Sequence, residues 1–342
     1  MSSISEGLSR ALNGPFTLPL ALDLNSNHKY ILFSDQHKGA GDRADEFRKC
    51  KETYMAALKH YRDAGFTLIL MGDVEELWEQ RFKKVEEAYQ DVLELEGSFP
   101  AGHYFRLWGN HDDDWMHPWA VDRHLAKYMP TSAVFEGIRF EVENDAEHLG
   151  TILLVHGHQG TLASDKFRLL SRFAVRIYRY IQRLTGIGTM TPAEDVCLRS
   201  KQDNEMYDWA HRQCELDLIL IAGHTHRPVW SSRTHLQKLQ LELEALQSGP
   251  DIPGKLELIE EIEAAIKRRE AKYPPCDDEI KTSPVYFNTG CCRFDDGDIT
   301  GIEIDNGTIR LIKWSRGSLT KTVFEQDTLT DIFERIKIHP KN

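Results

Sequence analysis

The sequence lacks several features that define whole classes of protein. No apolar run in its 342 residues approaches the roughly 20 residues that a membrane-spanning helix needs. The N-terminal residues have neither the long apolar core nor the small-residue cleavage site of a secretory signal. The six cysteines include no CxxC pair, and the adjacent Cys291 and Cys292 are poor candidates for a disulfide with each other. These absences predict a soluble, cytoplasmic protein with reduced thiols.

An excess of basic residues is also missing. The chain has 42 lysines and arginines against 54 aspartates and glutamates, which gives a formal net charge of −12. This charge argues against extensive, sequence-independent binding to nucleic-acid phosphates, and therefore against nucleic acid as a partner. Hydrophobic residues make up 41% of the chain, which is ample for a buried core.

Short apolar runs alternate with helix-period segments through the first two thirds of the chain, which predicts an α/β layered fold. Helices are expected over residues 44–65 and from about residue 75 to residue 96, and a hairpin-like pair of strands over 133–143 and 151–157. Other strands are expected at 29–35, 66–73, 103–110, 216–224, 283–290, 298–305 and 308–314. The last three of these add antiparallel β structure.

Two segments interrupt the alternation within what we interpret as a single domain over residues 1–342. Residues 163–213 form a mostly helical insert. Residues 231–281 form a second insert, with leucines spaced 3-4-3 before the breaker "SGPDIPG" and isoleucines repeating the pattern after it. The apolar positions are Leu236, Leu239, Leu243, Leu246, Ile259, Ile262 and Ile266. This pattern predicts an antiparallel helical hairpin that serves as a structural or dimerising arm, and hence a homo-oligomer formed through it, rather than a substrate contact.

Five apolar runs end in polar clusters built from residue types that bind metals. In chain order these clusters are "SDQH", "GDVEE", "GNHDD", "VHGH" and "GHTH". Each match alone is weak, but five in one order, each at the end of an apolar run, predict a metal site. Residues two apart on an extended chain point the same way, so Asp35 with His37, and His224 with His226, can each aim two ligands at one point.

The order of these motifs resembles that of the calcineurin-like metallophosphoesterase superfamily over about residues 29–228, and "YFNTG" near Phe287 looks like that family's closing strand. The resemblance implies a four-layer α-β-β-α sandwich that holds two divalent metal ions. Carried over by position, the first metal would be held by Asp35, His37 and His226, the second by Asn110, His156 and His224, and Asp73 would bridge both.

The chemistry of the residues agrees with this resemblance. Oxygen and imidazole ligands without thiolate suit Mn²⁺, our expected metal, with Fe or Zn²⁺ as alternatives. Two cations about 3.5–4 Å apart need a shared carboxylate to offset their repulsion, and a water bound to them becomes the hydroxide that attacks phosphorus. We expect His111 to meet the leaving group and Asp112 to orient His111. Glu75 and His158 are expected to support the site.

The first insert offers candidates for substrate binding. Arg168, Arg172 and Arg176 recur on one face of an amphipathic helix, which we interpret as a lid that grips phosphate, as a helix in peripheral contact with a membrane surface, or as a solvated packing helix. A lid at this point, together with "GDVEELWE", resembles the UDP-2,3-diacylglucosamine pyrophosphatase branch. Those enzymes typically carry arginine where this chain has His111, so we transfer the chemistry and not the lipid substrate.

The sequence therefore predicts a two-metal hydrolase of a small-molecule phosphodiester or pyrophosphate, nucleotide or lipid-linked. Two alternatives stay open. One is a phosphomonoesterase or protein phosphatase, and the other is a non-catalytic scaffold of the same fold whose helical arm docks a partner. The intact set of ligand residues speaks against the scaffold, because it is the set that catalysis needs.

Overall fold

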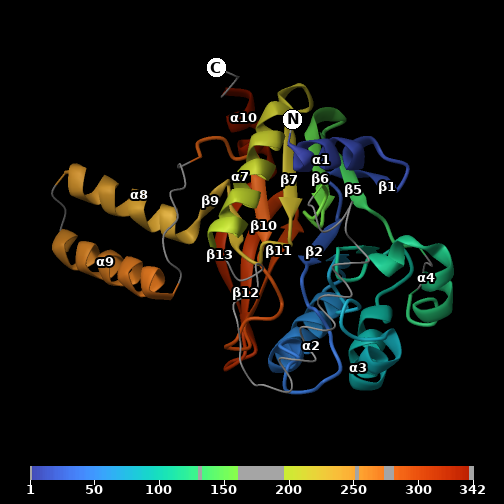
Figure 1. Ribbon diagram of the computed structural model, residues 1–342. Coiled ribbons are helices and arrows are strands. Elements are labelled where there is room, and N and C mark those ends of the chain that lie inside the picture. Colours follow the sequence, from blue (N-terminus) through green and yellow to red (C-terminus); the bar gives the residue numbers. More distant parts are fainter. Residues whose placement is uncertain (1, 130–132, 161–195, 251–253, 273–280, 339–342) are drawn as a thin grey trace.

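A computed structural model describes residues 2–129, 133–160, 196–250, 254–272 and 281–338, and shows two β-sheets flanked by helices (Figure 1). The seven-stranded sheet runs in the order β1 (Thr17–Asp23), β5 (Gly137–Asn144), β6 (Glu147–Val155), β7 (Leu218–Ala222), β10 (Tyr286–Thr289), β8 (Pro228–Trp230) and β9 (Arg233–Thr234). The six-stranded sheet runs in the order β13 (Thr320–Thr328), β12 (Thr308–Ser315), β11 (Ile299–Asp305), β2 (Lys29–Phe33), β3 (Thr67–Met71) and β4 (Tyr104–Leu107).

Each sheet contains a group of neighbouring parallel strands. In the six-stranded sheet, β2, β3 and β4 are parallel, while β11, β12 and β13 extend the sheet in antiparallel fashion. In the seven-stranded sheet, β6, β7 and β10 are parallel. The carboxyl ends of parallel strands lie at one edge of a sheet, so residues that follow these strands are gathered together.

The two sheets pack face to face, and alternation along the strands explains why. On β2, Leu32 faces the other sheet in one buried cluster, whereas its neighbours Ile31 and Phe33 belong to a second cluster with α2 (Phe47–Asp63) and α3 (Phe82–Gly97). Successive side chains of a strand point to opposite faces of the sheet, so a strand that is apolar at every position is buried on both faces.

Helices cover the outer faces of both sheets. On the seven-stranded sheet, α1 (Ser3–Asn13) contacts β1 and β5, and α7 (Val196–Arg212) contacts β7 and β10. On the six-stranded sheet, α2 contacts β3, β11 and β12. Other helices among the described residues include α4 (Pro118–His124) and α10 (Leu329–Ile338), and α10 contacts β6 and β13. This arrangement confirms the predicted α-β-β-α layers.

The helix expected to begin near residue 75 begins at Phe82 instead. Residues 74–81 form a loop whose backbone is tied to another loop, since Lys38 N–H donates to Val74 O and Glu76 N–H donates to Lys38 O. Glu75 and Glu76 are buried there, because both are paired with cationic or imidazole groups. The apolar pattern did not predict the N-terminal elements α1 and β1. The strand β1 lies at the edge of its sheet and contains Pro19, which is atypical of a strand interior.

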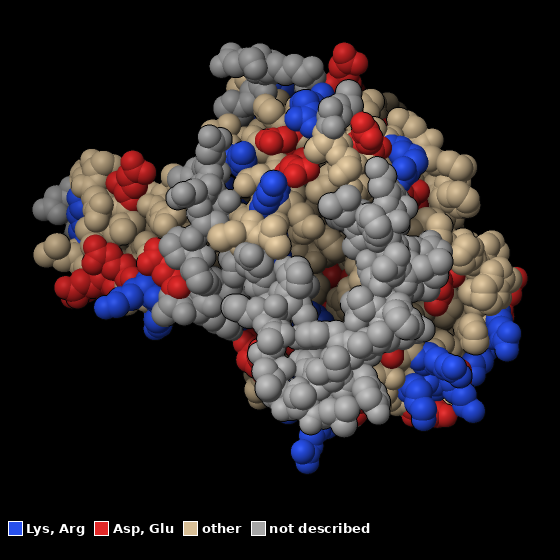
Figure 2. All heavy atoms as spheres, viewed as in Figure 1, with Lys and Arg blue, Asp and Glu red and all other residues tan. Residues whose placement is uncertain are grey.

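The second insert forms a helical hairpin that projects away from the sandwich (Figure 1). Its helices, α8 (His235–Ser248) and α9 (Lys255–Lys272), lie against each other. The predicted seam residues are at least partly buried, whereas Leu256 and Leu258 are 77% and 41% exposed. Figure 2 shows acidic and basic side chains close together on this hairpin.

The first insert falls partly outside the described residues. Residues 161–195 are not described, and Arg168, Arg172 and Arg176 lie among them. Residues 196–212 form α7, whose Met206 and Trp209 are buried in the main core against the seven-stranded sheet. This part of the insert is therefore a covering layer of the sandwich.

The cysteines differ in part from the expectation of reduced thiols. Cys50, Cys291 and Cys292 are free and buried. Cys197, near the start of α7, is disulfide-bonded. Within the described residues, none of the helices has the length and apolar character needed to cross a membrane.

Replacing Phe140 by alanine should lower the free energy of unfolding by about 3–5 kcal/mol, because the ring is fully buried between the sheets and packs edge-on against Tyr30. Phe324→Ala on β13 is the matched control, since this ring is 48% exposed, and it should cost no more than about 0.5 kcal/mol. Urea unfolding measures both values. Equal losses for the two variants would contradict this assignment of the core.

Candidate metal centre

Seven candidate ligands follow the carboxyl ends of five parallel strands. Asp35 and His37 follow β2, Asp73 follows β3, and Asn110 follows β4 in the six-stranded sheet. His156 follows β6, and His224 and His226 follow β7 in the seven-stranded sheet. The two sheets thus contribute to one site at the edge where their parallel strands end.

The backbone at the site is held in a conformation that most residues avoid. Asp35, His37, Asp73, His224 and His226 all have positive φ, between 48° and 67°. Non-glycine residues in this region are uncommon, and they cluster at functional sites where the surrounding structure fixes them. The strand ends therefore turn sharply to present these side chains.

Two glycines allow the loops to approach each other closely. A Cβ atom on Gly109 would lie 2.1 Å from Asp73 Oδ1, and one on Gly223 would lie 2.6 Å from Asp35 Oδ2. Gly72 and Gly157 have φ of +92° and +113° and supply turns.

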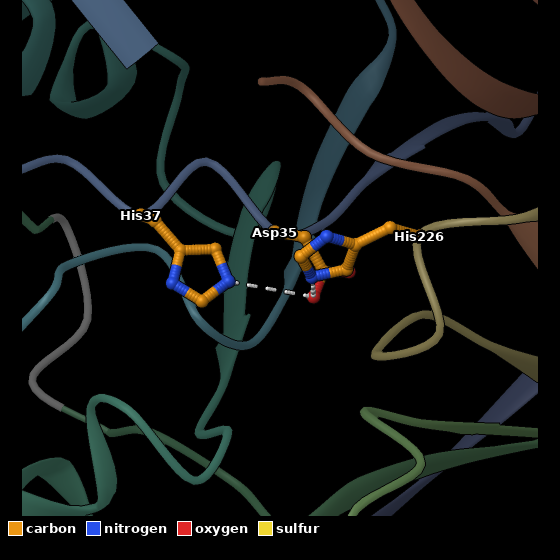
Figure 3. A group of neighbouring side chains, drawn as sticks. All are labelled: Asp35, His37 and His226. Carbon is orange, nitrogen blue, oxygen red and sulfur yellow. Dashed lines mark ion pairs between the residues drawn. The ribbon is translucent and has the colours of Figure 1, made fainter. Parts of the chain in front are cut away.

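The first group of ligands is Asp35, His37 and His226, whose ligand atoms lie within 4.8 Å of one another. Figure 3 shows the imidazole rings of both histidines turned toward the carboxylate of Asp35. His226 Nε2 is 3.0 Å and His37 Nε2 is 3.8 Å from Asp35 Oδ1. The second oxygen, Oδ2, is held by the hydroxyl of Ser34 and the N–H of His224.

The second group is Asp73, His156 and His224, again within 4.8 Å. His156 Nε2 lies 3.1 Å from Asp73 Oδ2, and His37 Nε2 of the first group lies 3.5 Å from the same oxygen. Asp73 is therefore the carboxylate that reaches both groups. Asn110 is buried next to His111, whose N–H donates to Asp73 Oδ1.

The donor atoms fit cation binding. Within the described residues, Asp35 Oδ1, His37 Nε2, Asn110 Oδ1 and His156 Nε2 are buried side-chain atoms without a hydrogen-bond partner. A buried polar atom without a partner costs free energy, whereas a bound cation would satisfy all four. Oxygen and imidazole donors suit divalent ions such as Mn²⁺, Fe²⁺ or Zn²⁺.

Hydrogen bonds on the far nitrogens point two rings at the site. His156 Nδ1 is 2.9 Å from the carbonyl oxygen of Met71, and His37 Nδ1 is 2.8 Å from Glu76 Oε2. Both partners are acceptors, so each Nδ1 carries a proton and each Nε2 is the nitrogen that faces the site.

The charges of four ligand side chains also favour ligation. Burial opposes ionisation, but the nearby histidines hold the pKa of Asp35 and of Asp73 well below the usual range. Burial lowers the pKa of His224 to about 4 and that of His226 to about 3, so both rings are neutral near pH 7. Ionised carboxylates and neutral imidazoles are the forms that bind metals. His156 is different: burial disfavours its charged form, but Asp73 and Asp35 outweigh burial and raise its pKa to about 9, so this ring would lose a proton when a cation binds.

His111 lies beside the first group, as expected, but a different carboxylate holds it. His111 Nδ1 is 2.8 Å from Glu76 Oε1, and the ring stacks on Trp78 with centroids 4.4 Å apart. Glu76 therefore connects His111 to the ligand His37 through its two oxygens. Sequence reasoning did not identify Glu76, because it falls where a helix was expected, although its place three residues after Asp73 was visible.

Asp112 does not orient His111, which corrects the sequence-based prediction. Its carboxylate instead accepts backbone N–H groups from Gly109, Asp73 and Val74, at 2.6, 3.2 and 2.8 Å. These bonds clamp the loops after β3 and β4 together. The physical reason is that the chain turns after His111, so that the adjacent carboxylate points back to the backbone while the imidazole points outward.

Two further networks support the loops. Glu75 is buried and pairs with Arg106 and Lys38, which places it in support of the loop as expected. Beneath the loop after β7, Asn288 Nδ2 donates to Gly223 O and Thr225 Oγ1, at 2.6 and 3.1 Å. His158 is buried with its ring 5.4 Å from that of His156.

The family model for calcineurin-like phosphoesterases matches residues 28–228, which is more than half of the chain. The chain therefore belongs to the calcineurin-like phosphoesterase family, whose members bind divalent metals. No curated protein matches the chain.

Solved structures with low similarity include a predicted phosphoesterase from Streptococcus pneumoniae TIGR4, at 11% identity and a TM-score of 0.32, covering 88% of this chain and 97% of that one. Vacuolar Protein Sorting 29 from Cryptosporidium parvum is 12% identical with a TM-score of 0.39, covering 88% and 98%. A single mutant of Vps29 from Entamoeba histolytica is 11% identical with a TM-score of 0.33, covering 88% and 99%. At these scores the similarity adds nothing to the family assignment.

Asp112→Asn should lower the free energy of unfolding of the metal-free protein by about 1–3 kcal/mol, because an amide cannot accept all three buried backbone N–H groups. The exposed Asp122→Asn change on α4 removes the same charge and should have almost no effect. Urea unfolding makes the comparison. A stable Asp112→Asn protein with an altered pH profile would instead restore the role predicted from the sequence.

Proposed function

We propose that this protein hydrolyses phosphoester bonds with two divalent metal ions, and that its substrate is a small-molecule phosphodiester or pyrophosphate. The proposal rests on one observation above all: Asp73 Oδ2 lies within 3.5 Å of histidines from both ligand groups. A carboxylate so placed can bridge two cations, which is the arrangement that in-line displacement at phosphorus uses.

Two bound cations would supply Lewis acidity toward phosphoryl oxygens and a water of lowered pKa as the nucleophile. Asp35, His37 and His226 would hold one ion, Asn110, His156 and His224 the other, and Asp73 both. Mn²⁺ is our proposed metal, on the chemistry of the donor set.

His111 is the group we propose for protonating the leaving oxygen. Its ring is 24% exposed, so a substrate can reach it, and it is stacked on Trp78, which fixes its plane. Burial disfavours its charged form, but Glu76 and Asp73 outweigh burial and raise its pKa to about 9. With Nδ1 held by Glu76, a protonated ring has Nε2–H available as the acid.

The substrate class rests on the sequence. The aromatic-ending second motif and an insert between the fourth and fifth motifs resemble the UDP-2,3-diacylglucosamine pyrophosphatase branch, which supports a diester or pyrophosphate. His111 in place of the arginine typical of that branch leaves the organic part of the substrate open, nucleotide or lipid-linked.

The purified protein with Mn²⁺ should hydrolyse an aryl phosphodiester and a nucleoside diphosphate sugar. Asp73→Asn should abolish this turnover and lose at least one bound cation, because the bridge loses its charge. Colorimetric assays and elemental analysis measure the two effects, with the exposed Asp63→Asn as the control. Hydrolysis of aryl monoesters alone would overturn the substrate class. Full metal content without turnover on any of these substrates would favour the scaffold.

His111→Ala should lower kcat by about 10²–10⁴-fold, the usual contribution of a general acid. Glu76→Gln should lower kcat by about 10–100-fold. The two carboxylate oxygens of Glu76 face His37 Nδ1 and His111 Nδ1, and in glutamine one of these positions becomes an NH2 group, which cannot accept a hydrogen bond from an imidazole N–H. Bound metal should stay near the parental level in His111→Ala. Glu87→Gln on the exposed side of α3 is the matched control and should keep the parental kcat. A Glu76→Gln protein with the same kcat as Glu87→Gln would contradict this assignment.

A further inference from the structure

We propose that Arg293 is a substrate-binding residue of the metal centre and that its guanidinium contacts the phosphoryl oxygens of the substrate. This inference rests on the proposed function. Arg293 lies in none of the five motifs, and its position beside the ligands is visible only in the tertiary structure.

The chain delivers Arg293 to the site along β10. This strand lies between β7 and β8, so its end is next to the end of β7, where His224 and His226 follow. Gly290, with φ of +77°, turns the chain out of the strand, and Cys291 and Cys292 are buried directly before Arg293. The buried neighbours fix the backbone at Arg293, and 22% of the Arg293 side chain is exposed.

Two contacts hold the guanidinium at the rim of the first ligand group. Arg293 Nε donates to His226 Nδ1 at 3.3 Å, and Nη1 lies 3.1 Å from Glu46 Oε2. Glu46 is itself 47% exposed, so this ion pair is weakened by solvent and can be exchanged for a stronger acceptor. A phosphoryl group offers that acceptor, because arginine binds phosphate oxygens through two parallel N–H groups.

The contact with His226 has a chemical consequence. When His226 gives the Nε2 lone pair to a metal, its proton must sit on Nδ1. Nδ1 would then be a donor facing the Nε donor of Arg293, and the hydrogen bond between them could not persist. Metal binding by His226 therefore favours release of the guanidinium toward an anion at the site.

The position of Arg293 also relates it to the proposed acid. The ring of His226, which Arg293 contacts, lies 5.3 Å from that of His37, and the ring of His37 lies 4.6 Å from that of His111. The cationic guanidinium therefore lies beside the same cluster of rings as the proposed acid, where it could bind an anionic phosphoryl oxygen.

The competing interpretation is that Arg293 only braces the ring of His226. A brace would be needed for metal binding, whereas a substrate-binding residue would be needed for anion affinity. The two roles can be separated by measuring metal content and phosphate binding independently of turnover.

The experiment compares the Mn²⁺-loaded parent protein with Arg293→Ala and Arg293→Lys. Elemental analysis should find equal metal in all three. Isothermal titration with inorganic phosphate should show an affinity about 10–100-fold lower in Arg293→Ala, which corresponds to the loss of a charge-assisted hydrogen bond, with Arg293→Lys in between. Arg48→Ala on the exposed face of α2 removes the same charge without contacting the site, and should bind phosphate as the parent does.

Lower metal content in Arg293→Ala would overturn the proposal in favour of the brace. Phosphate affinity equal to that of the parent, or a metal-loaded parent that binds no phosphate, would also overturn it. If the parent hydrolyses no phosphoester but loses phosphate binding in Arg293→Ala, the anion site stands and the proposed hydrolysis falls. When the parent is active, kcat/KM should fall with phosphate affinity in the same variant.

Discussion

The structure depends on the position of one carboxylate. Asp73 Oδ2 lies between His37, which follows a strand of one sheet, and His156, which follows a strand of the other. Holding an ionised group in a fully buried position is costly unless it is paired, and here the pairs come from imidazoles on both sheets. The face-to-face packing of the two sheets therefore determines whether the site exists at all.

Much of the surrounding polar structure offsets the cost of this arrangement. Five ligand residues occupy left-handed backbone conformations, each of which costs of the order of 1–3 kcal/mol. Asp112 clamps the loops after β3 and β4, and Asn288 holds the loop after β7. Glu76 fixes two rings at once. These residues bind no metal, yet they hold the ligands in a geometry that the backbone alone would not adopt.

The charge of the site and its surroundings would favour a phosphoester as the substrate of the proposed reaction. Ionised Asp35 and Asp73 offset only part of the charge of two divalent cations, so bound cations would leave net positive charge at the site. His111 and Arg293, whose side chains are 24% and 22% exposed, lie at the site on different loops, one after β4 and the other after β10. A substrate with several anionic oxygens complements this arrangement, whereas an uncharged ester would not.

The sequence by itself predicted an α/β layered fold from the periodicity of its apolar runs. The order of its motifs, through the family resemblance, predicted the α-β-β-α layers and the candidate ligands, because both signals are local properties of the chain. The sequence could not assign Asp112, since whether a carboxylate meets an imidazole or the backbone depends on how the loop turns. It missed Glu76, which a helical pattern concealed, and Arg293, which lies far along the chain from every other site residue. Those assignments were decided only by the tertiary structure, because they depend on which loops from two packed sheets come within hydrogen-bonding distance.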